Sequence, residues 1–378
     1  MSPLAEDRTR LRAVGEAHPR LDGLDVAAFT IPNDAPEADG TLAWEDTTIV
    51  VVEARSGAVT GVGYTYSDAA AATLIDGKLR GIVAGADALA PNAAWEGMRA
   101  AVRNLGRAGL CSSALSAVDI ALWDLKARLV GVPLADLLGR IHSAVPIYGS
   151  GGFTSYPIER LQAQLAEWVA GGIGRVKMKV GSQPDQDVDR VASARAAIGP
   201  KAELFVDANG AYERKQALDL AERFARSGVS WFEEPVSSDD LDGLRLVRGR
   251  APAGMAIAAG EYCYDLFAAA RLIQAEAVDV LQLDVTRCGG VGEFLRGSGL
   301  CAASALPLSA HTAPQVHAHV CAAIPNFEHI EYFHDHVRIE RLLFDGVLEP
   351  RDGALCPSRD RPGLGIELKR ADAARYAA

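Results

Sequence analysis

The strongest constraint on the fold is a regular alternation, over residues 145–333, of short apolar segments with longer segments of helical spacing. The pattern predicts strands at VPIYGS (145–150), RVKMKV (175–180), ELFVDA (203–208), SWFEE (230–234), MAIAAGE (255–261), VDVLQLD (278–284), LPLSAH (306–311) and EHIEYF (328–333). Helices are expected between them, near 156–171, 185–198, 213–227, 238–249, 263–275, 291–304 and 313–324. This order predicts an α/β fold, a closed (β/α)7β barrel of the TIM-like kind.

The first 135 residues do not follow this alternation. Residues 41–54 and 58–66 read as strands joined by a turn at 55–57, and helical stretches follow near 69–86, 91–106 and 109–131. We therefore expect an N-terminal α+β capping domain over 1–135 and the barrel over 136–335. The segment 336–378 has weak periodicity and several Gly and Pro, and we expect it to return to the capping domain.

The composition limits which classes of binding partner the protein can have. The 378 residues include 38 Lys and Arg against 49 Asp and Glu, a net charge of −11, which argues against a nucleic-acid footprint. An anionic substrate is not excluded, because a bound metal inverts the local field. The six cysteines form no C-x-x-C pair, and no apolar run reaches membrane-spanning length. We expect a cytoplasmic protein that binds a small molecule, with no membrane partner; a homo-oligomer is left open.

The ends of the second to eighth predicted strands each carry an ionisable residue. In a parallel β/α barrel, these ends form the active site. A single charged strand end is usually solvated, whereas seven consecutive ones are hard to explain as surface, since buried charges need partners or metal. The candidates are Lys177 and Lys179, Asp207 with Asn209, Glu233, Glu261, Asp284, His311 and Glu331.

Three of the carboxylates are spaced for a metal. Asp207, Glu233 and Glu261 lie 26 and 28 residues apart, and each step is one β/α unit, so their oxygens converge. Three hard oxygen donors with room for water and substrate suit Mg²⁺. The alternative is that they pair with lysines elsewhere. Glu234, the neighbour of Glu233, points to the other face of its strand.

Lys177 and Lys179 are two apart on one strand, so both point the same way. Because each positive charge lowers the pKa of the other, Lys179 is a candidate general base, with Lys177 holding the substrate carboxylate. A lone K-x-K is more often a solvated edge. Asp284 lies one strand before His311 and is expected to fix its tautomer, while a protonated Glu331 would hydrogen-bond an enolate oxygen.

Together these residues resemble the enolase superfamily, within it the mandelate racemase subgroup of the mandelate racemase/muconate lactonizing enzyme family. The resemblance covers nearly the whole chain. It rests on K-M-K at 177–179, D-A-N at 207–209, E-E-P at 233–235, G-E at 260–261, D-V-T-R-C-G-G at 284–290, S-A-H at 309–311 and Glu331.

The resemblance implies roles for these residues. Lys179 and His311 would be acid/base groups on opposite faces of the substrate, and Asp207, Glu233 and Glu261 the Mg²⁺ ligands. Asp284 would be the partner of His311, Glu331 the enolate hydrogen-bond donor, and Lys177 and Asn209 substrate contacts.

One position departs from the family. Many relatives carry Lys where Arg287 stands, and in the amino-acid epimerase branch a lysine on strand six is the second base. Because arginine does not deprotonate in proteins, that branch is disfavoured and His311 is the better second base.

The expected reaction is Mg²⁺-dependent removal of the proton α to a carboxylate, giving an enediolate. Dehydration of a monoacid sugar to a 2-keto-3-deoxy acid ranks ahead of racemisation of a 2-hydroxy acid. A non-catalytic acid-binding relative and a metal-dependent hydrolase are the remaining alternatives. Segment 31–46, taken as a loop over the barrel mouth, carries five acidic residues and no Lys or Arg, so it should repel a distal carboxylate or phosphate.

Two histidine pairs are weaker signals. His317 and His319 fall in a predicted helix, where residues two apart point to different sides, so a metal site is disfavoured. His334 and His336 follow the last strand, where a solvated loop is the simpler interpretation and the pocket mouth the alternative.

Overall fold

The computed structural model describes residues 18–378. Its centre is a ring of parallel strands, in which each strand pairs with the next and the last pairs with the first, Glu331 lying opposite Tyr148. The strands are β4 (Val145–Gly151), β5 (Arg175–Lys179), β6 (Glu203–Asp207), β7 (Val229–Glu233), β8 (Ala256–Ala259), β9 (Val280–Leu283), β10 (Leu308–Ala310) and β11 (Phe327–Phe333). The predicted TIM-like barrel is confirmed.

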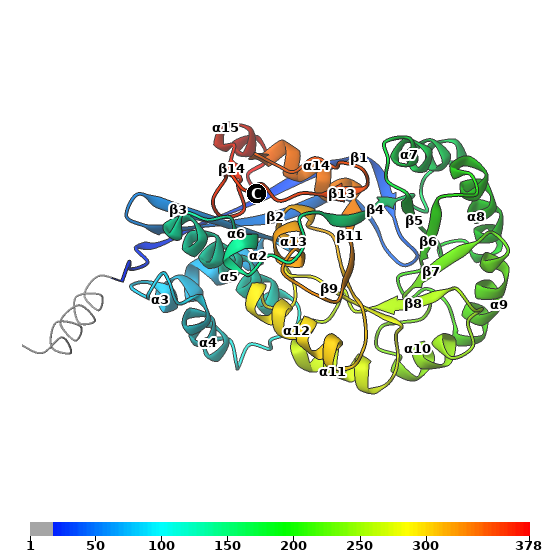
Figure 1. Ribbon diagram of the computed structural model, residues 1–378, viewed down its shortest axis with the longest axis horizontal. Coiled ribbons are helices and arrows are strands. Elements are labelled where there is room, and N and C mark those ends of the chain that lie inside the picture. The colour runs from blue at the N-terminus through cyan, green and yellow to red at the C-terminus, as the bar shows by residue number, and fades with distance from the viewer. Residues whose placement is uncertain (1–17) are drawn as a thin grey trace, which may run out of the picture.

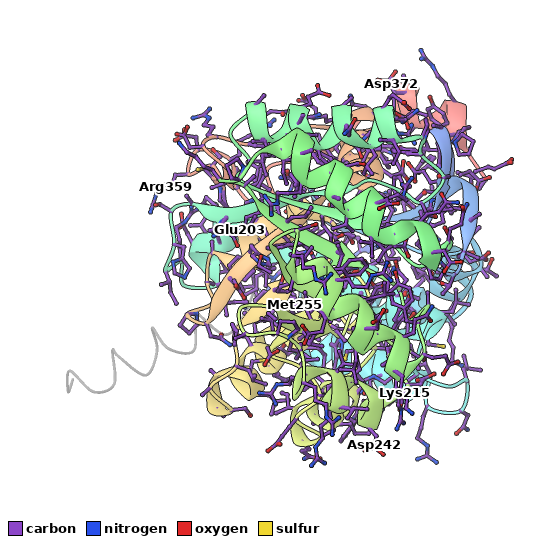
Figure 2. All side chains as sticks on the ribbon, turned by 90° about the vertical axis from the view of Figure 1, so that its right-hand side faces the viewer. Glu203, Lys215, Asp242, Met255, Arg359 and Asp372 are labelled. Carbon is purple, nitrogen blue, oxygen red and sulfur yellow. The ribbon has the colours of Figure 1, made fainter. Side chains whose placement is uncertain are left out.

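Seven helices connect these strands and cover the outside of the ring (Figure 1): α7 (Ile158–Ala170), α8 (Pro184–Ile198), α9 (Arg214–Ala225), α10 (Leu241–Arg248), α11 (Leu266–Gln274), α12 (Val291–Ala303) and α13 (Pro314–Cys321). Their polar faces point away from the barrel, as Lys215 on α9 and Asp242 on α10 show in Figure 2. Their apolar faces pack on the strands and form most of the hydrophobic core.

Several strands end earlier than the sequence predicts. The predicted strand at 255–261 stops at Ala259, because Gly260 adopts a left-handed φ of 133°. A Cβ at Gly260 would lie 2.2 Å from the carbonyl oxygen of Gln282, so no other residue fits there without movement. The following Glu261 is therefore held by the loop beyond the strand.

Inside the ring, a separate aromatic cluster lies directly beneath the site. Tyr148, Phe205 and Trp231 are buried, with the rings of Phe205 and Trp231 stacked at 5.4 Å between centroids. The ammonium of Lys177 lies 5.3 Å from the Tyr148 ring centroid. These rings form a dry floor beneath the strand-end charges.

The capping region contains a three-stranded antiparallel sheet of β1 (Gly23–Ala38), β2 (Ala43–Ser56) and β3 (Val59–Tyr66). Helices follow it: α2 (Ala70–Leu74), the π-helical η1 (Ile75–Leu79), α3 (Arg80–Val83), α4 (Pro91–Ala101), α5 (Leu110–Val130) and α6 (Leu134–Leu137). The α5 backbone packs directly on β3, since a Cβ at Gly61 or Gly63 would lie 2.3 Å from it.

The expectation of a loop over 31–46 is wrong, since these residues form the end of β1, the start of β2 and the tight turn between them. Pro32 and Pro36 argue against a strand when the sequence is considered alone. In the structure, the β1–β2 pairing is interrupted between Pro32 and Glu37. The tip of this hairpin does reach the barrel (Figure 1). A Cβ at Gly40 would lie 2.3 Å from the carbonyl oxygen of Ala208.

The last segment contacts both parts. It contains α14 (His334–Leu343), β12 (Phe344–Asp345), β13 (Ala354–Leu355), β14 (Glu367–Leu368), α15 (Arg370–Ala373) and the 3-10 helix η2 (Ala374–Tyr376). Strand β13 pairs with β4 of the barrel, while Ala377 bridges to Phe29 of β1. Across residues 18–378, no helix is long and apolar enough to cross a membrane, and all six cysteines are free.

Candidate active site

A cavity of about 410 Å³ lies between the strand ends of the barrel and the capping sheet. The barrel contributes five of the predicted site residues to its lining: Lys179, Asn209, Glu261, His311 and Glu331. The capping region contributes mainly polar and acidic groups, among them Asp39, Asp46, Thr47, Thr48, Ser67 and Asp68. The barrel side of the cavity therefore carries both cationic and acidic side chains, whereas the charged side chains on the cap side are all acidic.

The three predicted metal ligands meet below this cavity. One oxygen each from Asp207, Glu233 and Glu261 lies within 4.8 Å of the others, and all three side chains are buried. The indole of Trp231 donates to Oε2 of Glu233 at 3.0 Å, whereas Oε1 of Glu233 is buried with no hydrogen-bond partner among the described residues. Three converging hard donors and an orphaned carboxylate oxygen fit a divalent cation such as Mg²⁺.

The electrostatics show how closely these carboxylates are crowded. Burial raises the pKa of Glu233 to about 8, and the charge of Asp207 adds to the effect. Burial also acts to raise the pKa of Asp207, but the charges of Lys179 and Lys177 outweigh it and lower that pKa. The two lysines thus favour the ionised form of Asp207, whereas they do not offset the effect of burial on Glu233.

The two lysines lie at different depths. Nζ of Lys177 is 2.7 Å from Oε2 of Glu233 and 2.8 Å from Oε1 of Glu331, and its side chain is fully buried. It is not among the residues that line the cavity, and its contact with a substrate carboxylate stays a prediction. Lys179 does line the cavity, with Nζ 2.5 Å from Oδ2 of Asp207.

The expected lowering of the lysine pKa is also not seen. Burial and the charge of Lys177 act to lower the pKa of Lys179, but Asp207 and the other carboxylates outweigh them and raise it. Lys177 does act to lower the pKa of Lys179, as the sequence argument expected, but this effect is smaller than the opposing effect of the carboxylates. A divalent cation on the same oxygens would compete with the ammonium and lower this pKa.

On the other side of the carboxylates, His311 and Asp284 form a hydrogen-bonded pair. Nδ1 of His311 is 2.8 Å from Oδ2 of Asp284, while the backbone N–H and hydroxyl of Thr286 donate to Oδ1 at 2.7 Å each. Burial acts to raise the pKa of Asp284, but the hydrogen bond and charge of His311 hold it below its usual range. Nε2 of His311 lies 3.3 Å from Oε2 of Glu261.

Glu331 differs from the expectation of a protonated acid. Its Oε1 accepts from the hydroxyl of Ser150 at 2.6 Å and lies beside Lys177. Burial acts to raise the pKa of Glu331, but the charge of Lys177 outweighs it and lowers that pKa below its usual range. The ionised form of Glu331 is favoured over the acid, because Lys177 is close enough to form an ion pair with it.

Arg287 bridges the two halves of the site. Its Nη1 is 3.1 Å from Oε1 of Glu261, and its Nε is 3.5 Å from Oδ2 of Asp284. Burial acts to lower the pKa of Arg287, but Glu261 and Asp284 outweigh it and raise that pKa further. This agrees with the argument that Arg287 does not serve as a base.

Sequence reasoning missed several lining residues. His336 is buried in α14 and stacks on Tyr66, so the expected solvated loop is wrong; the pocket-mouth alternative holds for His336 and not for His334, which lines a different cavity. Tyr66 comes from β3 and no local motif marks it. His317 is structural, since its Nε2 accepts from the backbone N–H of Val285 at 2.9 Å, as the argument against a metal site expected.

Two family profiles match the chain. "Mandelate racemase / muconate lactonizing enzyme, N-terminal domain" matches residues 29–139, and "Enolase C-terminal domain-like" matches 160–373. The chain belongs to the mandelate racemase/muconate lactonizing enzyme family of the enolase superfamily. The recognition from the strand-end motifs is thereby confirmed.

Individual relatives agree with this assignment. A mandelate racemase/muconate lactonizing enzyme-like protein from Rubrobacter xylanophilus is 58% identical, with a TM-score of 0.94 over 95% of this chain and 100% of that one. A 3,6-anhydro-alpha-L-galactonate cycloisomerase from Streptomyces coelicolor is 35% identical over 84% of this chain and 88% of its own length. L-talarate/galactarate dehydratase from Salmonella typhimurium, liganded with Mg and L-lyxarohydroxamate, is 31% identical, with a TM-score of 0.88 over 96% and 94% of the two chains.

This member of the family is a magnesium-dependent enzyme. Structures of relatives contain magnesium, and the buried carboxylates of Asp207, Glu233 and Glu261 fit that ion here. The relatives include dehydratases, cycloisomerases and racemases, so family membership leaves the overall reaction open among these three.

Proposed function

We propose that this enzyme dehydrates a monoacid sugar to a 2-keto-3-deoxy acid. The observation that carries the proposal is the charge distribution of the cavity. Lys179, His311 and Arg287 lie on the barrel side, whereas the cap side presents Asp39, Asp46 and Asp68 with no Lys or Arg. A substrate with its carboxylate against the barrel and a neutral hydroxylated chain against the cap matches this polarity.

The hydrogen-bonding groups of the cavity also suit a hydroxylated chain. Thr47, Thr48 and Ser67 line the cap side, and the carboxamide Oδ1 of Asn209 is buried with no hydrogen-bond partner among residues 18–378. A buried acceptor of this kind costs free energy unless a donor reaches it, and a substrate hydroxyl is such a donor. Of the five acidic residues in 31–46, only Asp39 and Asp46 line the cavity.

The positions of Lys179 and His311 support proton transfer at two points of the substrate. Lys179 reaches the carboxylate cluster beside Asp207, whereas His311 reaches it beside Glu261. Magnesium, when bound, would neutralise negative charge on the substrate carboxylate. One of the two residues removes the proton from C2, and the other protonates the hydroxyl that leaves C3 as water. Asp284 keeps His311 oriented throughout.

The test is to incubate the magnesium enzyme with a panel of aldonic acids and the corresponding aldaric diacids, and to assay 2-keto acid formation. The proposal expects turnover of at least one aldonic acid, with aldaric acids slower because Asp39, Asp46 and Asp68 repel their second carboxylate. Turnover of aldaric acids alone would contradict the monoacid assignment. Keto acid from neither class would contradict dehydration.

Racemisation of a 2-hydroxy acid is the second candidate. Trp44, Tyr66, Tyr262 and Phe333 also line the cavity, and an aryl group would pack against them. Following optical rotation on aryl and alkyl 2-hydroxy acids distinguishes the two reactions. Loss of rotation without any keto acid from an aldonic acid would reverse the ranking.

A further inference from the structure

A second group of potential metal ligands lies outside the active-site cavity, where the capping hairpin crosses the start of α14. One ligand atom each from Asp34, Glu37 and His334 lies within 4.8 Å of the others. Asp34 lies in the irregular part of β1, where pairing with β2 is interrupted, and Glu37 is where that pairing resumes, opposite Trp44. His334 is the first residue of α14, directly after barrel strand β11. The group therefore joins the hairpin to the barrel.

Glu37 shows that this group is incomplete as it stands. Its side chain is 1% exposed, its Oε2 accepts from the indole N–H of Trp44 at 3.0 Å, and its Oε1 is buried with no hydrogen-bond partner among the described residues. Asp335, fully buried next to His334, likewise has an unpartnered Oδ2. Buried carboxylate oxygens without partners are costly, so a ligand is indicated.

The local charges leave room for one cation. Arg160 pairs with Asp34 at 3.3 Å and Arg338 with Asp335 at 2.6 Å, which leaves Glu37 without an ion-pair partner within residues 18–378. Burial raises the pKa of Glu37 to about 8, and the charges of Asp335 and Asp34 add to this. The buried Oε1 of Glu37, which has no hydrogen-bond partner among the described residues, is the position that a cation would fill.

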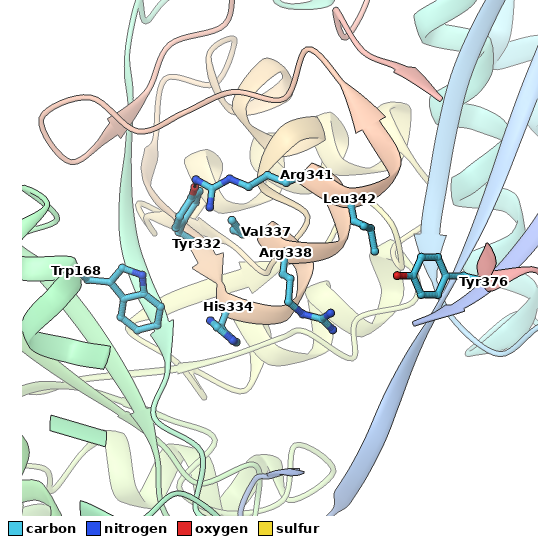
Figure 3. A pocket seen from close by; sticks show the side chains of 8 residues that line it. All are labelled: Trp168, Tyr332, His334, Val337, Arg338, Arg341, Leu342 and Tyr376. Atoms are coloured by element: carbon cyan, nitrogen blue, oxygen red, sulfur yellow. Dashed lines mark hydrogen bonds between the residues drawn. The ribbon is translucent and has the colours of Figure 1, made fainter. Parts of the chain in front are cut away.

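The site is also reachable. Nε2 of His334 is 3.2 Å from Oδ2 of Asp34, whose side chain is 41% exposed. His334 and Arg338 face a separate cavity of about 550 Å³, which Trp168, Tyr332 and Tyr376 also line (Figure 3). An ion can enter from this side without passing through the active site.

We propose that Asp34, Glu37 and His334 bind a second divalent cation, of the Zn²⁺ class, that fastens the capping hairpin to the barrel. One imidazole and two carboxylates form the donor set that zinc accepts and magnesium does not prefer. Donors about 2.1 Å from a tetrahedral ion lie about 3.4 Å apart, so the side chains need only move inward slightly. The site stands independently of the proposed reaction.

The site acts on the hairpin because Trp44 connects Glu37 to the active-site cavity. Trp44 donates to Glu37 on one side and lines the active-site cavity on the other, packing edge-on against Phe153 at 5.6 Å between ring centroids. A cation on Glu37 thus holds the hairpin strand that carries Trp44, Asp46 and Thr48 over the substrate. Its expected role is to keep this roof in place, with no part in proton transfer.

The test is equilibrium dialysis of the full chain against Zn²⁺ in a large excess of Mg²⁺, followed by metal analysis. Wild type should retain one zinc per chain. Glu37→Gln, which preserves the acceptor for Trp44, and His334→Asn should each weaken zinc binding at least ten-fold. Glu233→Gln is the control, because it damages the magnesium cluster and should leave this zinc bound. Zinc retained by Glu37→Gln and lost by Glu233→Gln would overturn the proposal, as would wild type without zinc.

A second readout does not depend on either variant being fully stable. Amide hydrogen exchange in residues 33–44 should slow when Zn²⁺ is added to wild type, because the ion fixes both sides of the hairpin to α14. In Asp34→Asn, the slowing should disappear. Because the side chain of Asp34 is partly exposed, this substitution should leave the fold intact, so misfolding would not explain the loss of slowing. Equal slowing in Asp34→Asn and wild type would overturn the proposed site.

Discussion

Nδ1 of His311 lies 2.8 Å from Oδ2 of Asp284, and this contact determines what the other ring nitrogen does. A carboxylate at Nδ1 favours a proton there, so Nε2, which lies 3.3 Å from Oε2 of Glu261, is the nitrogen left to exchange a proton at the cavity. Because the Thr286 N–H and hydroxyl both hold Oδ1, Asp284 cannot turn away. The orientation of His311 is therefore built into the loop after β9.

Asp284→Asn tests this orientation. The amide keeps the shape but removes the charge that favours the reactive tautomer, so turnover should fall on the order of 10–100-fold. Steady-state rates on the best aldonic acid measure the effect, with Asp219→Asn on the exposed face of α9 as the control. Rates within two-fold of wild type would show that Asp284 does not position His311.

The two acid/base residues should be separable by isotope exchange. In D₂O, a slow substrate analogue should exchange its α-proton in both configurations with the wild-type enzyme. Lys179→Ala and His311→Asn should each reduce exchange for one configuration by at least 10²-fold, because general acid–base groups contribute about that much. Proton NMR follows the exchange. Survival of both configurations in either variant contradicts the assignment of one base to each face.

The metal ligands can be tested by calorimetry. Glu233→Gln removes one charge from the carboxylate cluster, so Mg²⁺ affinity should fall by more than the 10–100-fold that outer-sphere changes cost. Glu203→Gln is the matched control, because Glu203 is exposed and lies at the opposite end of the adjacent strand β6. Equal Mg²⁺ affinity in Glu233→Gln and wild type would remove Glu233 from the ligand set.

Gly40 offers a test of the hairpin as the roof of the site. A methyl group there would meet the carbonyl oxygens of Ala208 and Val180 at 2.3 and 2.7 Å, so Gly40→Ala must lift the tip. We expect a loss of about 1–3 kcal/mol in stability and a raised KM. Gly23→Ala, at the start of β1 and with no atom within 4 Å of the added group, is the control. A variant with wild-type KM would mean that the tip does not shape the cavity.

Asp119 predicts a pH dependence of stability. It lies in α5, its Oδ2 accepts from the N–H of Val291 at 2.8 Å, and burial raises its pKa from 3.8 to about 8. Because the folded state holds this proton more tightly than the unfolded state, the contribution of Asp119 to stability is lost as pH rises from about 4 to 8. The slope is at most about 1.4 kcal/mol per pH unit.

Asp119→Asn removes that titration and retains an acceptor for Val291. The difference in thermal midpoint between variant and wild type should therefore move in favour of the variant as pH increases from 5 to 8. Differential scanning calorimetry at several pH values measures it. A difference that is constant with pH would show that Asp119 titrates alike in the folded and unfolded states.

Periodicity and strand-end chemistry were enough to predict the barrel and to gather its charged residues, because both signals are local and repeat seven times. The hairpin was missed because Pro32, Pro36 and Gly40 read as loop signals, whereas pairing with β2 makes the segment a strand. The depth of Lys177 and the ionised state of Glu331 were missed for a different reason. Both depend on which charge lies nearest in space, and Ser150, Lys177 and Glu331 come from three different strands.

The pairing of β11 with β4 has a consequence for how the chain is made. Until Phe327–Phe333 has left the ribosome, the ring is open and β4 presents an unpaired edge, since its partner lies about 180 residues further along. The same strand delivers Glu331 to Lys177 and Ser150. Closure of the barrel and completion of its charge network are thus a single late event during synthesis. Nascent chains stalled before that point should depend on chaperones and remain inactive.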